Sequence, residues 1–381
     1  MNFNLSEEHL MIRDAARDFA QNELLPGVIE RDTNQTFPHE QIKQLGELGF
    51  MGMMVDPSCG GSGLDTLSYV LAIEELSKID ASASVVVSVN NSLVCWGLDT
   101  YGTEKQKAKY LSKLAIGEYI GAFCLSEPEA GSDATSQSTT AVDMGDHYLL
   151  NGTKNWITNG GSCEIALVIA QTDKEKGYSG INVLIVEKGM DGFVVGQKED
   201  KLGIRGSDTH TLLFNDVKVP KENRIGEDGF GFKFAMKTLS GGRIGIAAQA
   251  LGIAQGALDL ALAYSKERKT FGKPIHDHQA IAFKLADMEM KVEQARLLVY
   301  KAAWLKDQGM PYDKESAMAK LAASEAAMWV STEAVQVHGG YGYVKEYHVE
   351  RLMRDAKITQ IYEGTSEIQR IVISRDLIKN S

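Results

Sequence analysis

A carboxylate on a glycine-containing turn is the first feature of this chain that could do chemistry. It lies in the segment 361–370 (IYEGTSEIQR), where Glu363 precedes a glycine. Ser366 and Gln369 have the spacing of a capping box, and apolar residues then recur with helical periodicity, so we expect a helix to begin here. A carboxylate held beside apolar residues is partly desolvated, which raises its pKa and suits it to proton abstraction. A solvated surface glutamate is the alternative, and this segment alone favours that alternative.

A second segment, 123–133 (FCLSEPEAGSD), is rich in groups that can donate hydrogen bonds. The backbone N–H groups and hydroxyls around Gly131 suit a phosphate or the edge of a heteroaromatic ring. An ordinary loop between domains is the alternative interpretation, and the local sequence favours it.

Several common motifs are absent from the sequence. It has no G-x-G-x-x-G after a strand, no G-x-x-x-x-G-K-[ST] and no G-x-S-x-G, which disfavours nicotinamide dehydrogenases, P-loop proteins and α/β-hydrolases. His276 and His278 form the closest histidine pair, but no cysteine or acidic ligand set accompanies them. We therefore expect surface histidines at a helix start and no metal site.

Composition places the chain among soluble globular proteins: 381 residues, of which 44% are hydrophobic and 24% are charged. A net charge of −11 disfavours a nucleic-acid-binding surface. Four scattered cysteines without a C-x-x-C pair predict reduced thiols. With no signal- or transit-peptide pattern at the first residues, they predict a cytoplasmic location. The apolar window 244–264 contains Gln249, Gln255 and Asp259, so we expect a buried bundle helix and no membrane insertion.

The pattern of residues divides the chain into three domains of an α+β fold. Residues 1–118 have helical periodicity, with Ser6 as the N-cap of the first helix and Pro38 at the start of another. Residues 119–230 contain short β-branched runs without long helices, which predicts an antiparallel β domain or a small barrel. Residues 231–381 return to helical periodicity and predict a four-helix bundle.

Two finer expectations concern the second and third domains. Asn151-Gly152 between two apolar runs is a hairpin signal, and further strands are expected over 165–172, 181–187 and 211–219. In the third domain, apolar residues spaced alternately by four and three positions form the seam of a packed helix: Ile281, Leu285, Met288, Val292, Ala295 and Val299.

Short motifs follow one another in a fixed order along nearly the whole chain. They are LSEP at 125–128, GSD at 131–133, NGTKNWITN at 151–159, KLGIRGS at 201–207, GRIGIA at 242–247, Arg268 with FGKPI at 271–275 and Gln279, QVHGGYG at 336–342, RDA at 354–356 and YEGT at 362–365. Together they resemble the acyl-CoA dehydrogenase family, most closely its short-chain (butyryl-CoA) branch. Any one motif could arise by chance, but the ordered set is specific.

The resemblance implies a homotetramer of helical, β and helical domains that binds FAD non-covalently. The implied reaction, which belongs to fatty acid β-oxidation, is α,β-dehydrogenation of an acyl-CoA thioester. Glu363 would remove the pro-R α-proton, while the β-hydrogen leaves as hydride to flavin N5. Its own backbone N–H and a ribityl hydroxyl of the flavin would stabilise the developing enolate. Electrons would pass to an electron-transferring flavoprotein.

Binding roles carry over by resemblance to the matching positions. The flavin ring would be lined by Phe123, Leu125, Ser126 and Ser132, and its opposite edge by Trp156, Ile157 and Thr158. The pyrophosphate and adenosine of a neighbouring subunit's FAD would be reached by Arg268, Phe271, Gln279, Gln336, Val337, His338, Gly339 and Gly340. Thr365 and Glu367 would approach the adenosine half, and the acyl-CoA would be contacted by Ser132, Ser240, Arg243 and Gly364. The alternatives are a strand core residue for Trp156 and a solvated helix-end charge for Arg268.

One position departs from the short-chain pattern, since Ser240 stands where relatives usually carry an acidic residue. Branches such as the isovaleryl-CoA enzymes draw their base from the helix around Gly242, where this chain has no carboxylate. The sequence therefore favours Glu363 as the base. An acyl-CoA oxidase, usually much longer, or a catalytically weak scaffold of the same fold are the alternative functions. The lifetime of reduced flavin in air would distinguish the oxidase, and a colourless protein that FAD cannot reconstitute would indicate the scaffold. The length of the acyl chain stays open.

Overall fold

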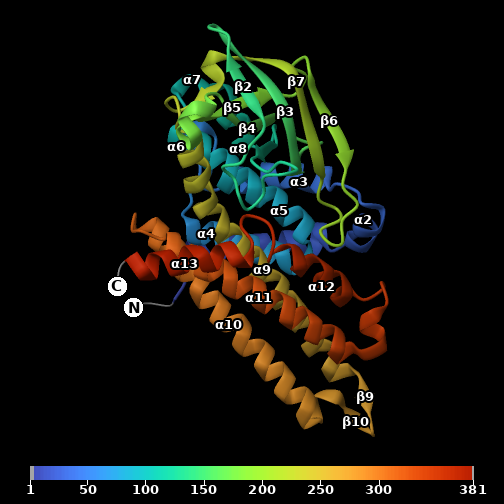
Figure 1. The fold of residues 1–381 in the computed structure, drawn as a ribbon. Coiled ribbons are helices and arrows are strands. Elements are labelled where there is room, and N and C mark those ends of the chain that lie inside the picture. Colours follow the sequence, from blue (N-terminus) through green and yellow to red (C-terminus); the bar gives the residue numbers. More distant parts are fainter. Residues whose placement is uncertain (1–3, 380–381) are drawn as a thin grey trace.

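The computed structural model describes residues 4–379 as a helical region, a β-sheet and a bundle of long helices (Figure 1). The sheet lies at one end of the molecule. The long helices extend to the other end, where a short two-stranded hairpin closes them. This is the α+β architecture expected from the sequence.

The first region is a set of helices around one apolar core. It consists of α1 (Glu7–Phe19), α2 (Val28–Asn34), α3 (His39–Glu47), α4 (Thr66–Ile79), α5 (Ala81–Val89), α6 (Trp96–Tyr101), α7 (Glu104–Gln106) and α8 (Ser112–Ala115). Ser6 caps α1 as predicted, because its hydroxyl accepts the N–H of His9. Pro38 was expected to be the first residue of α3 but is its N-cap, so the helix begins one residue later than predicted, at His39.

The second region is an eight-stranded sheet. Its strands are β1 (Gly121–Cys124), β2 (Thr140–Asp143), β3 (His147–Thr158), β4 (Ile165–Gln171), β5 (Ile181–Glu187), β6 (Phe193–Lys198), β7 (Thr209–Pro220) and β8 (Arg224–Ile225). The order is β6-β7-β3-β2-β4-β5-β8, with β1 paired to β4. Most pairs are antiparallel as predicted, but β1–β4 and β2–β4 are parallel, so the sheet is mixed.

The predicted hairpin at Asn151-Gly152 is wrong, because β3 continues through both residues. The register of β3 against β7 shifts between Leu150 and Gly152, so the pair forms a β-bulge and not a turn. Gly152 has φ +147°, and a Cβ there would lie 2.5 Å from the Thr139 hydroxyl oxygen. Asn151 exchanges hydrogen bonds with Asp216 on the neighbouring strand. The two residues therefore bend a long strand, which the turn-like dipeptide does not reveal.

The third region is the helical bundle. It consists of α9 (Gly231–Glu267), α10 (Gln279–Asp307), α11 (Asp313–His338), α12 (His348–Ile358) and α13 (Ser366–Lys379), with β9 (Lys269–Thr270) and β10 (Lys273–Pro274) between α9 and α10. The predicted seam faces inward, with its last four residues buried and the first two packed against the core. Helix α9 and the segment 81–101 are long and apolar enough to cross a membrane. Most of the apolar window of each (72% and 94%) is buried inside the protein.

A buried carboxylate attaches the β domain to the bundle. Asp355 on α12 accepts a hydrogen bond from the N–H of Ile204 (2.5 Å) and pairs with Arg351 (2.8 Å). A Cβ at Gly203 would lie 2.3 Å from the carbonyl oxygen of Arg354, so only glycine permits this approach. The motifs KLGIRGS and RDA, distant in sequence, therefore form one contact between two domains.

Candidate active site

Glu363 lies on a left-handed turn between α12 and α13. The segment that joins these two helices is on the side of the bundle that faces the sheet (Figure 1). Glu363 has φ +52° and Gly364 has φ +95°. Glycine adopts a positive φ without strain, but for Glu363, which carries a side chain, this conformation costs free energy. Tyr362 precedes them and donates its hydroxyl to the amide oxygen of Gln249 on α9. The turn is thus held by specific side-chain contacts, as a site with one required geometry must be.

The capping box predicted for Ser366 and Gln369 is wrong. Ser366 is the first residue of α13, and the hydroxyl oxygen of Thr365 instead accepts the N–H of Ile368 (3.4 Å). The side-chain amide of Gln369 points back and donates to the carbonyl oxygen of Gly364 (2.7 Å). The spacing correctly predicted a helix start. The left-handed turn ends at Gly364, so the cap is Thr365, one residue before Ser366.

The carboxylate of Glu363 lies against α9 in an apolar setting. A Cβ at Gly242 would be 2.2 Å from Glu363 Oε2 and 2.7 Å from Leu93 Cδ2. Within residues 4–379, this Oε2 atom is buried without a hydrogen-bond partner. Burial raises the pKa of Glu363 to about 7, against the opposing attraction of Lys320 and Arg243. A carboxyl group with a pKa near neutrality can accept a proton and release it again at physiological pH.

Two predicted substrate contacts lie on α9 beside this turn. Ser240 is nearly buried, and its hydroxyl donates to the carbonyl oxygen of Met236 within the helix (3.2 Å). Arg243 is also nearly buried, and its guanidinium is close to Glu363, Asp313 and Tyr312. Burial lowers the pKa of Arg243. Both residues lie within two positions of Gly242 on α9, but the serine hydroxyl is already engaged inside its own helix.

The residues predicted around the flavin ring lie on β1, on the loop after it and at the end of β3. Trp156 has φ +62° at a second β-bulge, and its ring is 62% exposed, so it is not the core residue considered as the alternative. Thr158 and Ser126 are half-buried, and Ser132 is exposed. The side chain of Ile157 points into the core of the sheet, so only its backbone is available for binding. Phe123 and Leu125 pack against the main core.

Glu127 and Lys154, which were not among the predicted site residues, form a fully buried ion pair under this loop. Lys154 Nζ lies 2.7 Å from Glu127 Oε1 and 3.0 Å from the carbonyl oxygen of Leu125. Glu127 Oε2 also accepts the N–H and the hydroxyl of Ser138 (2.7 Å each). Burial alone raises the pKa of Glu127, but Lys154 and these hydrogen bonds outweigh it and lower the pKa to about 2. A lysine on the inward face of a strand was the signal that could have revealed the pair.

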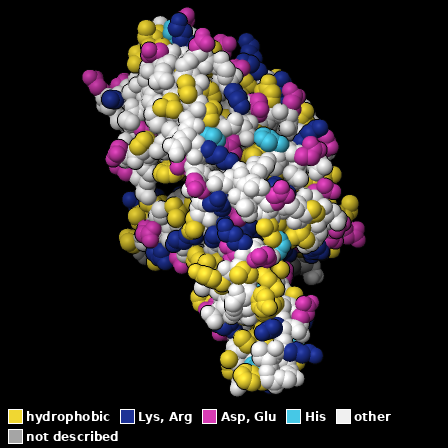
Figure 2. All heavy atoms as spheres, turned by 90° about the vertical axis from the view of Figure 1, so that its right-hand side faces the viewer, with side chains coloured by type: hydrophobic (Ala, Val, Ile, Leu, Met, Phe, Trp, Pro, Cys, Tyr) yellow, Lys and Arg dark blue, Asp and Glu magenta, His cyan; other side chains and the backbone are white. Residues whose placement is uncertain are grey.

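Thr365 and Glu367 lie at the start of α13, next to the Glu363 turn. The residues predicted to reach a neighbouring subunit's FAD lie at the far end of the bundle. They surround the β9–β10 hairpin, which Figure 1 places away from the sheet and Figure 2 shows as part of a narrow projection with hydrophobic and basic side chains. Arg268 lies over the ring of Tyr341 (5.8 Å), and Phe271 is 96% exposed. Gln279, Gln336, Gly339 and Gly340 are exposed, whereas Val337 and His338 are buried, the latter stacked on Tyr264. One chain therefore does not bring these residues together with Trp156 or Glu363.

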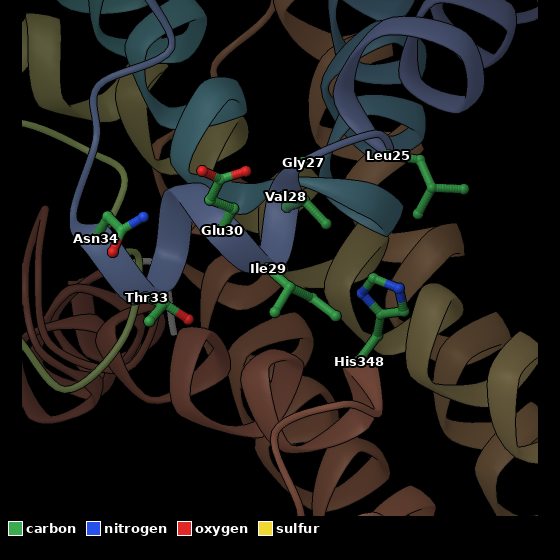
Figure 3. A pocket seen from close by; sticks show the side chains of 8 residues that line it. All are labelled: Leu25, Gly27, Val28, Ile29, Glu30, Thr33, Asn34 and His348. Carbon is green, nitrogen blue, oxygen red and sulfur yellow. The ribbon is translucent and has the colours of Figure 1, made fainter.

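A concave pocket of about 530 Å³ lies elsewhere, between α2 and the first residue of α12 (Figure 3). Leu25, Val28 and Ile29 supply apolar walls, and the ring of His348 points towards them. None of the predicted site residues lines this pocket. We therefore assign the site from the buried carboxylate and its neighbours and not from pocket size.

Family models described as the N-terminal, middle and C-terminal domains of acyl-CoA dehydrogenase match residues 6–118, 122–217 and 229–378. The "Acyl-CoA dehydrogenase, short-chain specific" of Clostridium acetobutylicum is 52% identical over 379 residues, covering all of both chains.

Two solved structures superpose on the full chain. One is described as the three-dimensional structure of butyryl-CoA dehydrogenase from Megasphaera elsdenii; its TM-score is 0.98 at 52% identity, covering 99% of this chain and 100% of that one. The other is described as "Electron transferring flavoprotein of Acidaminococcus fermentans: Towards a mechanism of flavin-based electron bifurcation". Its matching chain has a TM-score of 0.99 at 53% identity, with complete coverage of both.

Proposed function

The chain belongs to the acyl-CoA dehydrogenase family, and on that premise we propose that it converts a short-chain acyl-CoA to trans-2-enoyl-CoA. The observation that carries this proposal is the Glu363 carboxylate, buried on a fixed turn with Oε2 unpaired and the pKa raised to about 7. The α-proton of a thioester is only weakly acidic, so its removal needs a base with this property. We assign that role to Glu363.

The family consists of FAD enzymes, and the residues of this chain fit that cofactor. The exposed Trp156 ring at a β-bulge, beside the hydroxyls of Thr158 and Ser126, suits a flat heteroaromatic ring. When bound, FAD accepts the hydride that leaves the β-carbon. We propose that Phe123, Leu125, Ser126, Ser132, Trp156, Ile157 and Thr158 line the flavin ring, and that Thr365 and Glu367 approach the adenosine half.

Different groups of this chain act on different parts of the thioester substrate. The carboxylate of Glu363 takes the α-proton, and the backbone N–H of the same residue stabilises the charge that develops on the thioester oxygen. The carbonyl oxygen of Gly364 is already engaged by side-chain donors, so this residue can offer substrate only its N–H. Ser240 and Arg243 are assigned to the CoA part. The short acyl chain is inferred from identity to the short-chain specific relative.

A homotetramer is proposed from an apolar stripe on α10. Phe283, Met290, Leu297 and Trp304 are spaced by seven residues, and each side chain is more than half exposed. Seven-residue spacing keeps them on one helix face, opposite the buried seam, as in an interface between packed helices. Assembly would let the exposed Arg268, Phe271, Gln279 and the segment 336–340 reach the FAD of a neighbouring subunit. These residues lie far from Trp156 in their own chain.

An electron-transferring flavoprotein is proposed as the electron acceptor, on the strength of the matching chain in the Acidaminococcus structure. Residues 1–118, 119–230 and 231–381 are proposed as the domains, since α8 ends at Ala115, β1 begins at Gly121 and α9 begins at Gly231. A cytoplasmic location is proposed because all four cysteines are free thiols.

The test is the substitution Glu363→Gln in the FAD-loaded protein. We expect the flavin to stay bound and turnover of butyryl-CoA with a dye acceptor to fall by about 10³-fold or more, because the amide cannot accept the proton. Glu222→Gln, at an exposed position of the β domain, is the matched control. Full turnover in Glu363→Gln would reject the assignment. A screen of C4 to C16 thioesters tests chain length, and a maximum at C12 or longer would contradict the short-chain proposal.

A further inference from the structure

Lys320 is a fully buried lysine whose ammonium group reaches the turn that carries Glu363. It lies in α11, and its Nζ donates to the carbonyl oxygen of Gly364 at 2.7 Å. The side-chain amide of Gln369, also fully buried, donates to the same oxygen at 2.7 Å. Two donors from two helices thus converge on the residue after the carboxylate.

The charge of Lys320 is costly to bury and has no ion-pair partner within 4.0 Å in the part of the chain that the structure describes, where its hydrogen-bond partner is the carbonyl oxygen of Gly364. The charged groups that face it are Glu363, Arg243, Glu325 and Glu367. Burial lowers the pKa of Lys320 to about 8, opposed by the attraction of Glu363. At pH 7 the side chain is therefore mostly an ammonium. Among the neighbouring carboxylates, Glu363 has the largest effect on the pKa of Lys320.

The left-handed turn explains why such a clamp is needed. Glu363 has φ +52°, which a residue with a side chain adopts only when its surroundings enforce it. Fixing the carbonyl oxygen of Gly364 from two sides prevents the peptide from rotating to a more common conformation. The same contact holds a second positive charge, besides that of Arg243, near a carboxylate that is buried against apolar atoms of α9 and Leu93.

We propose that Lys320 is a positioning residue for Glu363: it clamps the Gly364 carbonyl oxygen and places a positive charge near the neighbouring carboxylate. This inference rests on the proposed role of Glu363 as the base. Its sequence setting, a single lysine within the small apolar run AMAKLAAS, agrees with a charge retained in a core for a specific contact.

The experiment compares Lys320→Met, Lys320→Gln and Lys320→Arg as FAD-loaded proteins, measuring kcat and KM for butyryl-CoA from pH 5.5 to 9.5. In Lys320→Met we expect the rising limb of kcat against pH to move up by about one unit, so that kcat at pH 6 falls about tenfold. The KM should change much less. Lys320→Gln can keep a donor without the charge and should show the same shift, whereas Lys320→Arg should restore the limb to its original pH.

Lys201→Met is the matched control. Lys201 Nζ also donates to a backbone carbonyl oxygen, that of Ser207 (2.8 Å), and burial likewise lowers its pKa to about 8, but it does not contact the turn. This variant should keep the original pH profile. An unshifted limb in both Lys320→Met and Lys320→Gln, with flavin content and melting temperature intact, would overturn the proposal. If Lys320→Met does not fold, the same comparison is made with Lys320→Gln, whose limb should shift, and Lys320→Arg, whose limb should not. An unshifted limb in Lys320→Gln would then overturn the proposal.

Failure of the inference and failure of the proposed function give different results. If Glu363 is not the base, Glu363→Gln retains turnover whatever Lys320 does. If Glu363 is the base but Lys320 only packs the core, Glu363→Gln abolishes turnover and the Lys320 variants keep the original pH profile.

Discussion

Gly242 and Glu363 share one packing position, although they are 121 positions apart in the sequence. A Cβ on Gly242 would lie 2.2 Å from Oε2 of the glutamate, closer than non-bonded atoms approach. Helix α9 and the turn before α13 therefore reach the same point in space. The lack of any side chain on α9 is what leaves room for the carboxylate.

Gly242→Ala should displace the carboxylate of Glu363 and lower kcat by about tenfold or more, since misplacing a base by about 1 Å is costly. The measurement is kcat with butyryl-CoA, with flavin content monitored in parallel. Gly241→Ala is the control, because a Cβ there would meet only Lys306 Nζ at 3.8 Å, an ordinary contact. Equal activity in the two variants would contradict the shared position.

The pKa of Glu363 makes a prediction about stability as well as activity. The folded state holds this proton more tightly than the unfolded state, with a pKa of about 7 against an ordinary value of 4.5. Wild-type protein should therefore lose stability relative to Glu363→Gln as the pH rises from 4.5 to 7, by about 1 to 3 kcal/mol. Denaturant unfolding of both proteins at pH 5 and pH 8 measures this difference. A constant difference at the two pH values would show that the group does not titrate as described.

The buried pair of Glu127 and Lys154 should dominate the stability of the loop after β1. Lys154→Met leaves a buried carboxylate without its partner and should reduce the free energy of unfolding by about 3 to 5 kcal/mol. The exposed pair of Lys176 and Asp173 provides the control, and Lys176→Met should cost less than about 1 kcal/mol. Flavin affinity should fall in the first variant only, because Leu125 and Ser126, which we propose to line the flavin, belong to the loop that the buried pair holds. Comparable losses in both variants would argue against this role.

The apolar stripe on α10 should control oligomeric state. Leu297→Asp places a charge in the middle of the stripe and is expected to shift the protein from tetramer to smaller species, measured by light scattering after size exclusion. Glu289→Lys changes a charge at an exposed position of the same helix outside the stripe and should leave the mass unchanged. A tetramer that survives Leu297→Asp would place the interface elsewhere.

Local sequence predicted those features that depend on neighbouring residues. The seam of α10 follows from apolar spacing alone, and the Ser6 cap from one hydroxyl at a helix start. Asn151-Gly152 misled because the dipeptide permits a turn but also a bulge, and the choice is made by the neighbouring strand. The same applies at Ser366, where the strained turn moves the cap by one residue.

The candidate site was predicted only in part, because its contacts join distant segments. Local sequence predicted a helix start beside Glu363 but favoured a solvated carboxylate. Its burial, the approach of Gly242 and the hydrogen bond from Lys320 follow from how α9 and α11 pack. No spacing rule gives these contacts. The inward-facing Lys154 signals a buried partner, but the identity of that partner depends on how β3 packs on the loop that contains Glu127.

The contact between Asp355 and the N–H of Ile204 limits how this molecule can move. If the β domain opened away from α12, the carboxylate of Asp355 and the N–H of Ile204 would lose their hydrogen bond, which makes a hinge at this point unfavourable. We therefore expect substrate entry and product release to rely on side chains and short loops while the two domains stay together. We expect hydrogen exchange at Ile204 to be as slow as in the core strands, with or without substrate.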